Sequence, residues 1–106
     1  QSGREFWLAG AEGLTVRPRR TGDRLERPGR PGRTVKKIMI DQKLPRHLRD
    51  TVPVLDSGGR VAAVAELGPD AAFLPRLGEP CWHITAKRKG EYFMLEKDIQ
   101  EILFSE

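Results

Sequence analysis

The chain of 106 residues is poor in cysteine, histidine and aromatic side chains, the last making up only 7 %. Its single cysteine, Cys81, cannot form an internal disulfide, which favours a reducing, cytoplasmic setting. Cys81, His47 and His83 match no zinc spacing, so we expect no metal site. No apolar run approaches the roughly 20 residues of a membrane-spanning helix, and no secretory signal is recognisable. We therefore expect no membrane partner.

The composition favours one small folded domain. Hydrophobic residues make up 38 % and charged residues 32 % of the chain, respectively below and above the usual values for globular proteins. Valine, isoleucine, leucine and phenylalanine nevertheless recur in short patterned runs, which a disordered tail would lack.

Short apolar runs bounded by glycine and proline predict several short strands. In the second of them we expect Leu14 and Val16 to face the core, with Thr15 and Arg17 facing outward. Residues 57–59, Ser-Gly-Gly, predict a hairpin turn. The expected strands cover residues 5–8, 14–17, 53–56, 61–67 and 82–87.

The strongest helix signal covers residues 34–42. Thr34 is a suitable N-cap, and apolar residues at 35, 38 and 39 form a stripe, which leaves Lys36 and Lys37 on the opposite side. Residues 45–50 predict a further helical turn, because proline is favoured at the first helical position. The expected fold class is α+β: a small antiparallel sheet or open sandwich of short strands, covered by one or two short helices.

Positive charge is concentrated between Arg17 and Arg49. This stretch holds twelve arginine or lysine residues against three acids, a local net charge of +9 on a chain whose total is +4. Residues 18–33 contain three prolines and three glycines and predict a long loop. Such a charge density suits a polyanion, and aromatic residues are absent from the stretch, so contact with a duplex backbone is favoured over base stacking.

Catalytic patterns are weak by comparison. Cys81 and His83 invite a nucleophile–base pair, but residues two apart on a strand point in parallel rather than at each other. The Ser-Gly-Gly triplet lacks the lysine and hydroxyl residue of a Walker loop. Asp23 after Gly22 is better suited to organising a turn than to acting as a base.

The basic stretch and the strands around it resemble the C-terminal domain of tRNA(Ile)-lysidine synthetases over about residues 6–90. The resemblance is carried by L-T-V-R-P-R-R-T-G-D-R (14–24), V-K-K-I-M-I-D-Q-K-L-P-R-H-L-R-D-T-V-P-V-L (35–55) and G-G-R-V-A-A-V (58–64). It implies a tRNA-recognition domain that grips the acceptor stem of tRNA(Ile). The lysine-ligating catalytic domain, with its ATP and magnesium, would lie N-terminal to this region, and no cofactor is expected here.

By the same resemblance, two groups of residues are expected to form the binding site, which would contain no catalytic residue. Gly22 and Asp23 would organise the loop that aims Arg24. The expected tRNA contacts are Arg17, Arg19, Arg20, Arg24, Lys36, Lys37, Lys43 and Arg49.

The acidic C-terminal residues differ in composition from the rest of the chain. Apolar residues at 95, 99, 102 and 103 predict an acidic helix over residues 91–106, and we place a domain over residues 4–90 before it. Residues 94–106 also resemble the N-terminal end of hypoxanthine phosphoribosyltransferase, which would make 91–106 a fusion junction.

Two alternatives to tRNA binding remain open from the sequence. One is a protein–protein interaction module whose basic loop docks an acidic partner. The other is a stand-alone enzyme that uses Cys81 or His83.

Overall fold

The computed structural model describes residues 4–11, 13–76, 78, 80–89 and 92–101. Its strands are β1 (Glu5–Leu8), β2 (Thr15–Arg17), β3 (Arg24–Leu25), β4 (Arg33–Thr34), β5 (Val54–Ser57), β6 (Arg60–Val64), β7 (Gly68–Pro69), β8 (Pro80–Lys89) and β9 (Tyr92–Glu101). Its helices are α1 (Val35–Asp41) and the short 3₁₀ helices η1 (Arg46–Leu48) and η2 (Ala71–Phe73). In this described part, no helix has the length and apolar character needed to cross a bilayer.

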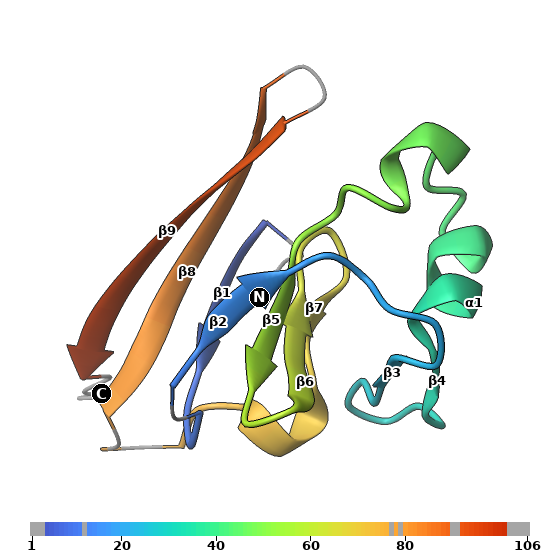
Figure 1. The fold of residues 1–106 in the computed structure, drawn as a ribbon. Helices are drawn as coiled ribbons and strands as arrows, with labels where there is room; N and C mark the ends of the chain where they lie inside the picture. Colours follow the sequence, from blue (N-terminus) through green and yellow to red (C-terminus); the bar gives the residue numbers. More distant parts are fainter. Residues whose placement is uncertain (1–3, 12, 77, 79, 90–91, 102–106) are drawn as a thin grey trace.

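The strands form antiparallel sheets that stack in layers (Figure 1). One sheet has the order β2-β5-β6-β7 and a second the order β1-β8-β9, while β3 and β4 pair by themselves. Helix α1 lies on the side of the four-stranded sheet away from β8 and β9 (Figure 1). The predicted α+β class, with small antiparallel sheets and short helical segments, is confirmed.

The central strands β5 and β6 are apolar on both faces because each face covers a separate core. Val54 and Val64 belong to the core that includes Ile38 of α1. Leu55 and Ala63 belong to a second core, which includes residues of β1 and β8. The β5–β6 ladder pairs Val54 with Val64 and Leu55 with Ala63, and its register shifts between Leu55 and Asp56.

The main local predictions for helix and hairpin are confirmed. The Thr34 hydroxyl accepts a hydrogen bond from the backbone N–H of Lys37 at 3.2 Å, so Thr34 is the N-cap of α1. The β5–β6 hairpin turns through Gly58 and Gly59 at φ +61° and +90°, a conformation that favours glycine at both positions of a two-residue turn.

The orientation predicted for residues 14–17 is right for Leu14, which packs against a core, and for Thr15, which is exposed, but wrong for Val16 and Arg17. Val16 is 46 % exposed, whereas the Arg17 side chain is only 10 % exposed. The hydrophobic pattern is overridden because two carboxylates, from Asp23 and Asp56, meet the Arg17 guanidinium below the sheet surface. A charged group can be buried where its partners neutralise it.

The predicted helical tail is also wrong within the described residues. Residues 92–101 form β9, which pairs with β8 along its whole length from Lys89↔Tyr92 to Pro80↔Glu101. The ladder with β8 is a long-range interaction, which can override the local helical pattern. Ile102 and Leu103, half of the predicted stripe, lie outside the described residues.

The loop predicted over residues 18–33 is better ordered than expected. Its second half is a hairpin, with the register Arg24↔Thr34 and Leu25↔Arg33 between β3 and β4. Leu25 is buried in the core under α1. This hairpin leads directly into the first residue of α1, so the basic loop and the helix form one continuous unit.

Candidate nucleic-acid interface

A tight turn attaches the first half of the basic loop to the start of α1. The turn closes through a hydrogen bond from the Asp23 N–H to the Arg20 carbonyl at 3.1 Å, and Gly22 takes φ +92° within it. One oxygen of the Asp23 carboxylate accepts the Arg20 N–H at 2.8 Å. The Asp23 carbonyl in turn accepts the N–H of Val35, the first residue of α1, at 2.8 Å.

This connection links the Arg20–Asp23 turn and β3 to α1, and the exposed cations of these linked segments form one group. We call this group the basic corner, and all five of its side chains are exposed. Among the described residues, none of them forms a direct ion pair with a carboxylate. The charge of Arg20 nevertheless helps to lower the pKa values of Asp23 and Asp56, and Arg24 donates to the Gly32 carbonyl at 2.9 Å. The basic corner consists of Arg20, Arg24, Lys36, Lys37 and Lys43.

Lys43 occupies a backbone conformation that usually belongs to glycine. It has φ +57° and ends α1 in a Schellman arrangement, in which its N–H reaches the Ile40 carbonyl and the Leu44 N–H reaches the Met39 carbonyl, both at 2.9 Å. A left-handed non-glycine residue costs about 1–2 kcal/mol. The chain tolerates this strain and thereby presents an ammonium group at the end of the helix.

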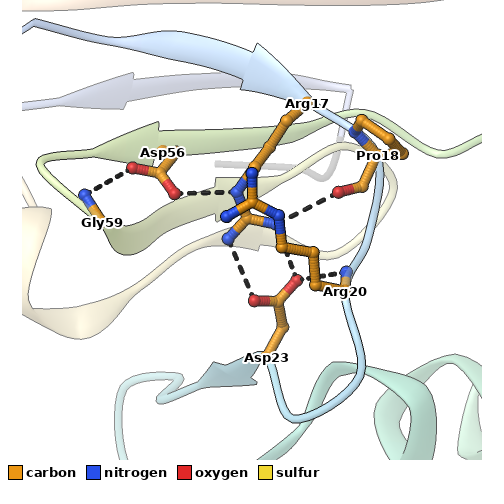
Figure 2. Close-up of polar contacts among 6 residues, drawn as sticks. All are labelled: Arg17, Pro18, Arg20, Asp23, Asp56 and Gly59. Atoms are coloured by element: carbon orange, nitrogen blue, oxygen red, sulfur yellow. Dashed lines mark hydrogen bonds and ion pairs between the residues drawn. The ribbon is translucent and has the colours of Figure 1, made fainter.

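Arg17 lies between Asp23 of the turn and Asp56 of β5 and has a different role (Figure 2). Its Nε donates to Asp56 at 2.8 Å, while Nη1 and Nη2 donate to the two oxygens of Asp23 at 2.9 and 3.0 Å. The second oxygen of Asp56 accepts the Gly59 N–H of the β5–β6 hairpin at 2.7 Å. We therefore assign Arg17 a structural role: it ties the Arg20–Asp23 turn to the central sheet.

The charges in this cluster stabilise one another. The hydrogen bond from Arg17 is the main reason why the pKa of Asp56 lies below its ordinary value, against the opposing effect of burial. Burial alone would raise the pKa of Asp23, but hydrogen bonds from Arg17 and from the Arg20 backbone lower it overall. The same bond to Asp23 leads the causes that raise the pKa of Arg17.

Acid should weaken the fold through these two carboxylates. Because their pKa values are lower in the folded chain, the stability they contribute is complete above about pH 4, the ordinary aspartate range, and is lost as pH falls through the folded values. We expect the urea midpoint to fall between pH 5 and pH 2.5. The variant Asp56→Asn should show a smaller fall, whereas Asp50→Asn, altered at an exposed carboxylate, should behave like the parent. An equal fall in all three proteins would contradict this assignment.

Two further predicted contacts are also held by the protein itself. Arg19 donates to Asp50 at 2.8 Å and its side chain is 15 % exposed. Its buried Nε has no hydrogen-bond partner among the described atoms. The Nε of Arg49 donates to the Leu44 carbonyl at 3.0 Å. These two arginines therefore connect the segments around η1 and β2.

Three arginines that the sequence predictions left out lie beside α1. Arg27, Arg30 and Arg33 line a cavity together with residues of the helix. The sequence contains a signal that could have identified them, because R-P-G-R-P-G-R over residues 27–33 spaces arginine at every third position.

The candidate catalytic residues form no reactive arrangement. Burial raises the pKa of the Cys81 thiol, which keeps it protonated and weakly nucleophilic. The His83 ring lies 2.9 Å from a Glu5 carboxylate oxygen and stacks on Trp7 at a centroid distance of 4.7 Å. Within the described ranges, no three histidine, cysteine or acidic side chains are grouped so that they could hold a metal ion.

Known proteins match nearly the same part of the chain as the resemblance found in the sequence. The family model described as the TilS substrate C-terminal domain matches residues 14–86. A tRNA(Ile)-lysidine synthase of Alkalilimnicola ehrlichii is 42 % identical over 72 residues, which are 67 % of this chain and 16 % of that protein. One from Symbiobacterium thermophilum is 38 % identical over 80 residues, 74 % of this chain and 17 % of the relative.

A third relative, the tRNA(Ile)-lysidine synthase of Methylococcus capsulatus, is 46 % identical over 59 residues, 55 % of this chain and 13 % of the relative. No solved structure matches significantly. The chain thus spans 16–17 % of the length of the first two relatives. The matched residues end at 86, so the resemblance of residues 94–106 to a phosphoribosyltransferase and the boundary at residue 90 stay predictions. Since the family model covers more than half of its residues, the chain belongs to the family of TilS substrate C-terminal domains.

Proposed function

We propose that this domain binds the acceptor stem of an isoleucine tRNA for a tRNA(Ile)-lysidine synthase. In that enzyme a separate catalytic domain would use ATP and magnesium to attach lysine to the wobble cytidine. The observation that carries the proposal is the basic corner: five exposed cations without a direct ion pair in the described structure, on the Arg20–Asp23 turn, on β3, on α1 and just after the C-cap of α1. Family membership and the names of the relatives support the substrate class, and a cytoplasmic setting is part of the proposal.

The chemistry of the corner suits the backbone of a duplex. Arg20 and Arg24 offer planar guanidinium groups that match phosphate oxygens in pairs. Lys36 and Lys37 add point charges on the first turn of α1, and Lys43 adds one just beyond its C-cap. No aromatic side chain belongs to the corner, which disfavours stacking on unpaired bases. A-form RNA is read mainly through its shape and backbone.

The buried cluster around Arg17 serves this function by preorganisation. Asp23 holds the Arg20 backbone N–H and the Arg17 guanidinium at once, and its carbonyl holds the start of α1. The turn is therefore fixed before RNA arrives. Cations on a preorganised support lose less conformational entropy on binding than cations on a mobile loop.

A gel-shift titration at two salt concentrations tests the proposal. We expect an isoleucine tRNA and its isolated acceptor-stem hairpin to bind with similar affinity, and an anticodon-stem hairpin to bind more weakly. If all five cations of the basic corner contact phosphate, the log–log salt slope is about −4 to −5, and raising salt from 50 to 200 mM weakens binding on the order of 10²- to 10³-fold.

The same titration separates RNA binding from the alternative of a docking module for acidic proteins. Absence of any shift with tRNA at 50 mM salt would reject the proposal. Binding to the anticodon hairpin as tight as to the acceptor hairpin would reject the acceptor-stem assignment and leave general RNA binding.

A further inference from the structure

The Arg-Pro-Gly repeat folds into a turn that places its arginines close together. The Arg30 N–H donates to the Arg27 carbonyl at 3.1 Å. Pro28 and Gly29 lie between them, and Gly29 takes φ +72°, as a type II turn requires of its third residue. Arg27 and Arg30 therefore stand at the two ends of one turn, and Arg33 follows where β4 begins.

The three guanidinium groups line a cavity between this turn and α1. We call it the arginine pocket; its volume is about 380 Å³, and Asp41 and Gln42 close it on the helix side. Asp41 is the single acid in the lining and is bound to Arg33 at 3.0 Å. The lining therefore carries three positive charges and one negative charge, a net charge of +2.

Hydrogen bonds hold in place the loop that forms the arginine pocket. The Glu26 carbonyl accepts the Ala71 N–H at 2.6 Å, which ties the loop to η2. Nη2 of Arg24 donates to the Gly32 carbonyl at 2.9 Å. A side chain at Gly32 would place its Cβ 2.9 Å from Cγ of Glu26, so the Glu26 side chain packs closely over the loop at this point. The pocket is thus part of the folded hairpin and not a gap beside a free loop.

The pocket is electrostatically unbalanced in the absence of an anion. The pKa of Arg27 lies below its ordinary value, first because the group is partly buried and then because Arg30 and Arg33 repel it. Like charges held this close raise the free energy of the folded chain unless a counter-charge enters. An anion with two negative charges would neutralise the lining.

We propose that the arginine pocket binds the terminal phosphate monoester of an RNA, the 5′-phosphate at the end of the acceptor stem. This inference rests on the proposed function, because it concerns the same RNA. A terminal phosphate carries about −1.5 to −2 charges at pH 7 and three free oxygens. A bridging phosphodiester carries one negative charge and continues as chain on both sides, which suits the open surface of the basic corner better than a cavity.

Two acceptor-stem hairpins of identical sequence, one with a 5′-phosphate and one with a 5′-hydroxyl, test the proposal. We expect the phosphorylated hairpin to bind about ten-fold more tightly at 100 mM salt, because it adds charge-assisted hydrogen bonds. Arg27→Gln with Arg30→Gln should remove this preference. The single variant Arg30→Gln, at an exposed position, should remove part of the preference. It provides a second test in case the double variant does not fold. Arg76→Gln with Lys87→Gln, which changes the same charge outside the pocket lining, should keep the preference in full.

Acidity gives an independent readout. The second pKa of a phosphate monoester is about 6, so the preference should shrink between pH 7.5 and pH 5.5, while binding of the hydroxyl hairpin changes little. Equal binding of both hairpins by the parent protein, or a preference that survives the removal of Arg27 and Arg30, would overturn the pocket assignment and leave the proposed function intact. Failure of both hairpins to bind at 50 mM salt would overturn both proposals.

Discussion

Replacing Arg17 by methionine is expected to lower the free energy of unfolding by about 3–5 kcal/mol, the usual effect of removing one partner from a buried ion pair. The substitution would leave the carboxylates of Asp23 and Asp56 in a site where each is about 10 % exposed. Small domains have only about 5–15 kcal/mol of stability in total. Urea denaturation at pH 7 measures the change directly.

A rescue variant separates the charge effect from the loss of packing. Combining Arg17→Met with Asp23→Asn and Asp56→Asn removes all three charges, while the amide oxygens can still accept the backbone N–H groups of Arg20 and Gly59. We expect the triple variant to be more stable than Arg17→Met alone. Arg46→Met, at an exposed position, should change stability by less than about 0.5 kcal/mol.

A loss of less than about 1 kcal/mol for Arg17→Met would show that the buried cluster does not hold the turn, since that is within the range of exposed ion pairs. In that case Arg17 would return to the set of candidate phosphate contacts.

Reversing the charge of Lys36 and Lys37 is expected to weaken binding of the acceptor-stem hairpin by about 10- to 100-fold at 100 mM salt, because two phosphate contacts become repulsive. The fold should remain intact. Both side chains are exposed, the buried face of α1 is formed by other residues, and glutamate near a helix N-terminus interacts favourably with the helix dipole. Fluorescence anisotropy with the labelled hairpin gives the affinity, and circular dichroism checks the fold.

The matched control makes the same change in net charge elsewhere. Arg76→Glu with Lys87→Glu alters two exposed cations outside the basic corner, and we expect it to weaken binding far less. Equal losses in the two double variants would mean that only the total charge matters, and the basic corner would have no special role.

Local signals predicted the fold of this chain well where the structure depends on local contacts. The stripe at Val35, Ile38 and Met39 is buried under α1, and Thr34 caps the helix. The hairpin at Gly58 and Gly59 follows from the backbone freedom of glycine. Each of these features is decided within a few residues of the chain.

Features that depend on distant partners could not be predicted in the same way. The alternating pattern predicted that Arg17 faces outward. The sequence does not reveal that the carboxylate of Asp56, far along the chain, accepts a hydrogen bond from Arg17. The apolar spacing of the tail predicted a helix, whereas β8 provides a ladder for residues 92–101. In both cases a long-range contact decided the outcome against a local preference.

In the candidate site, too, some features could be predicted from local sequence and others could not. Exposure of Lys36 and Lys37 followed from helix periodicity alone. The eight predicted contacts were treated alike, but the structure separates buried Arg17 and the paired Arg19 from the exposed groups of the basic corner, which form no direct ion pair in the described structure. Only the three-dimensional placement of the acids makes this distinction.

The salt dependence of binding to the acceptor-stem hairpin, measured side by side for the parent chain and for the variant Lys36→Glu with Lys37→Glu, tests the role of the basic corner most directly. We predict a log–log slope of about −4 to −5 for the parent and a slope shallower by about 2 for the variant, because each phosphate-contacting lysine contributes roughly one to the slope. Identical slopes for the two proteins, or a parent slope near zero, would contradict a phosphate-binding surface at this corner.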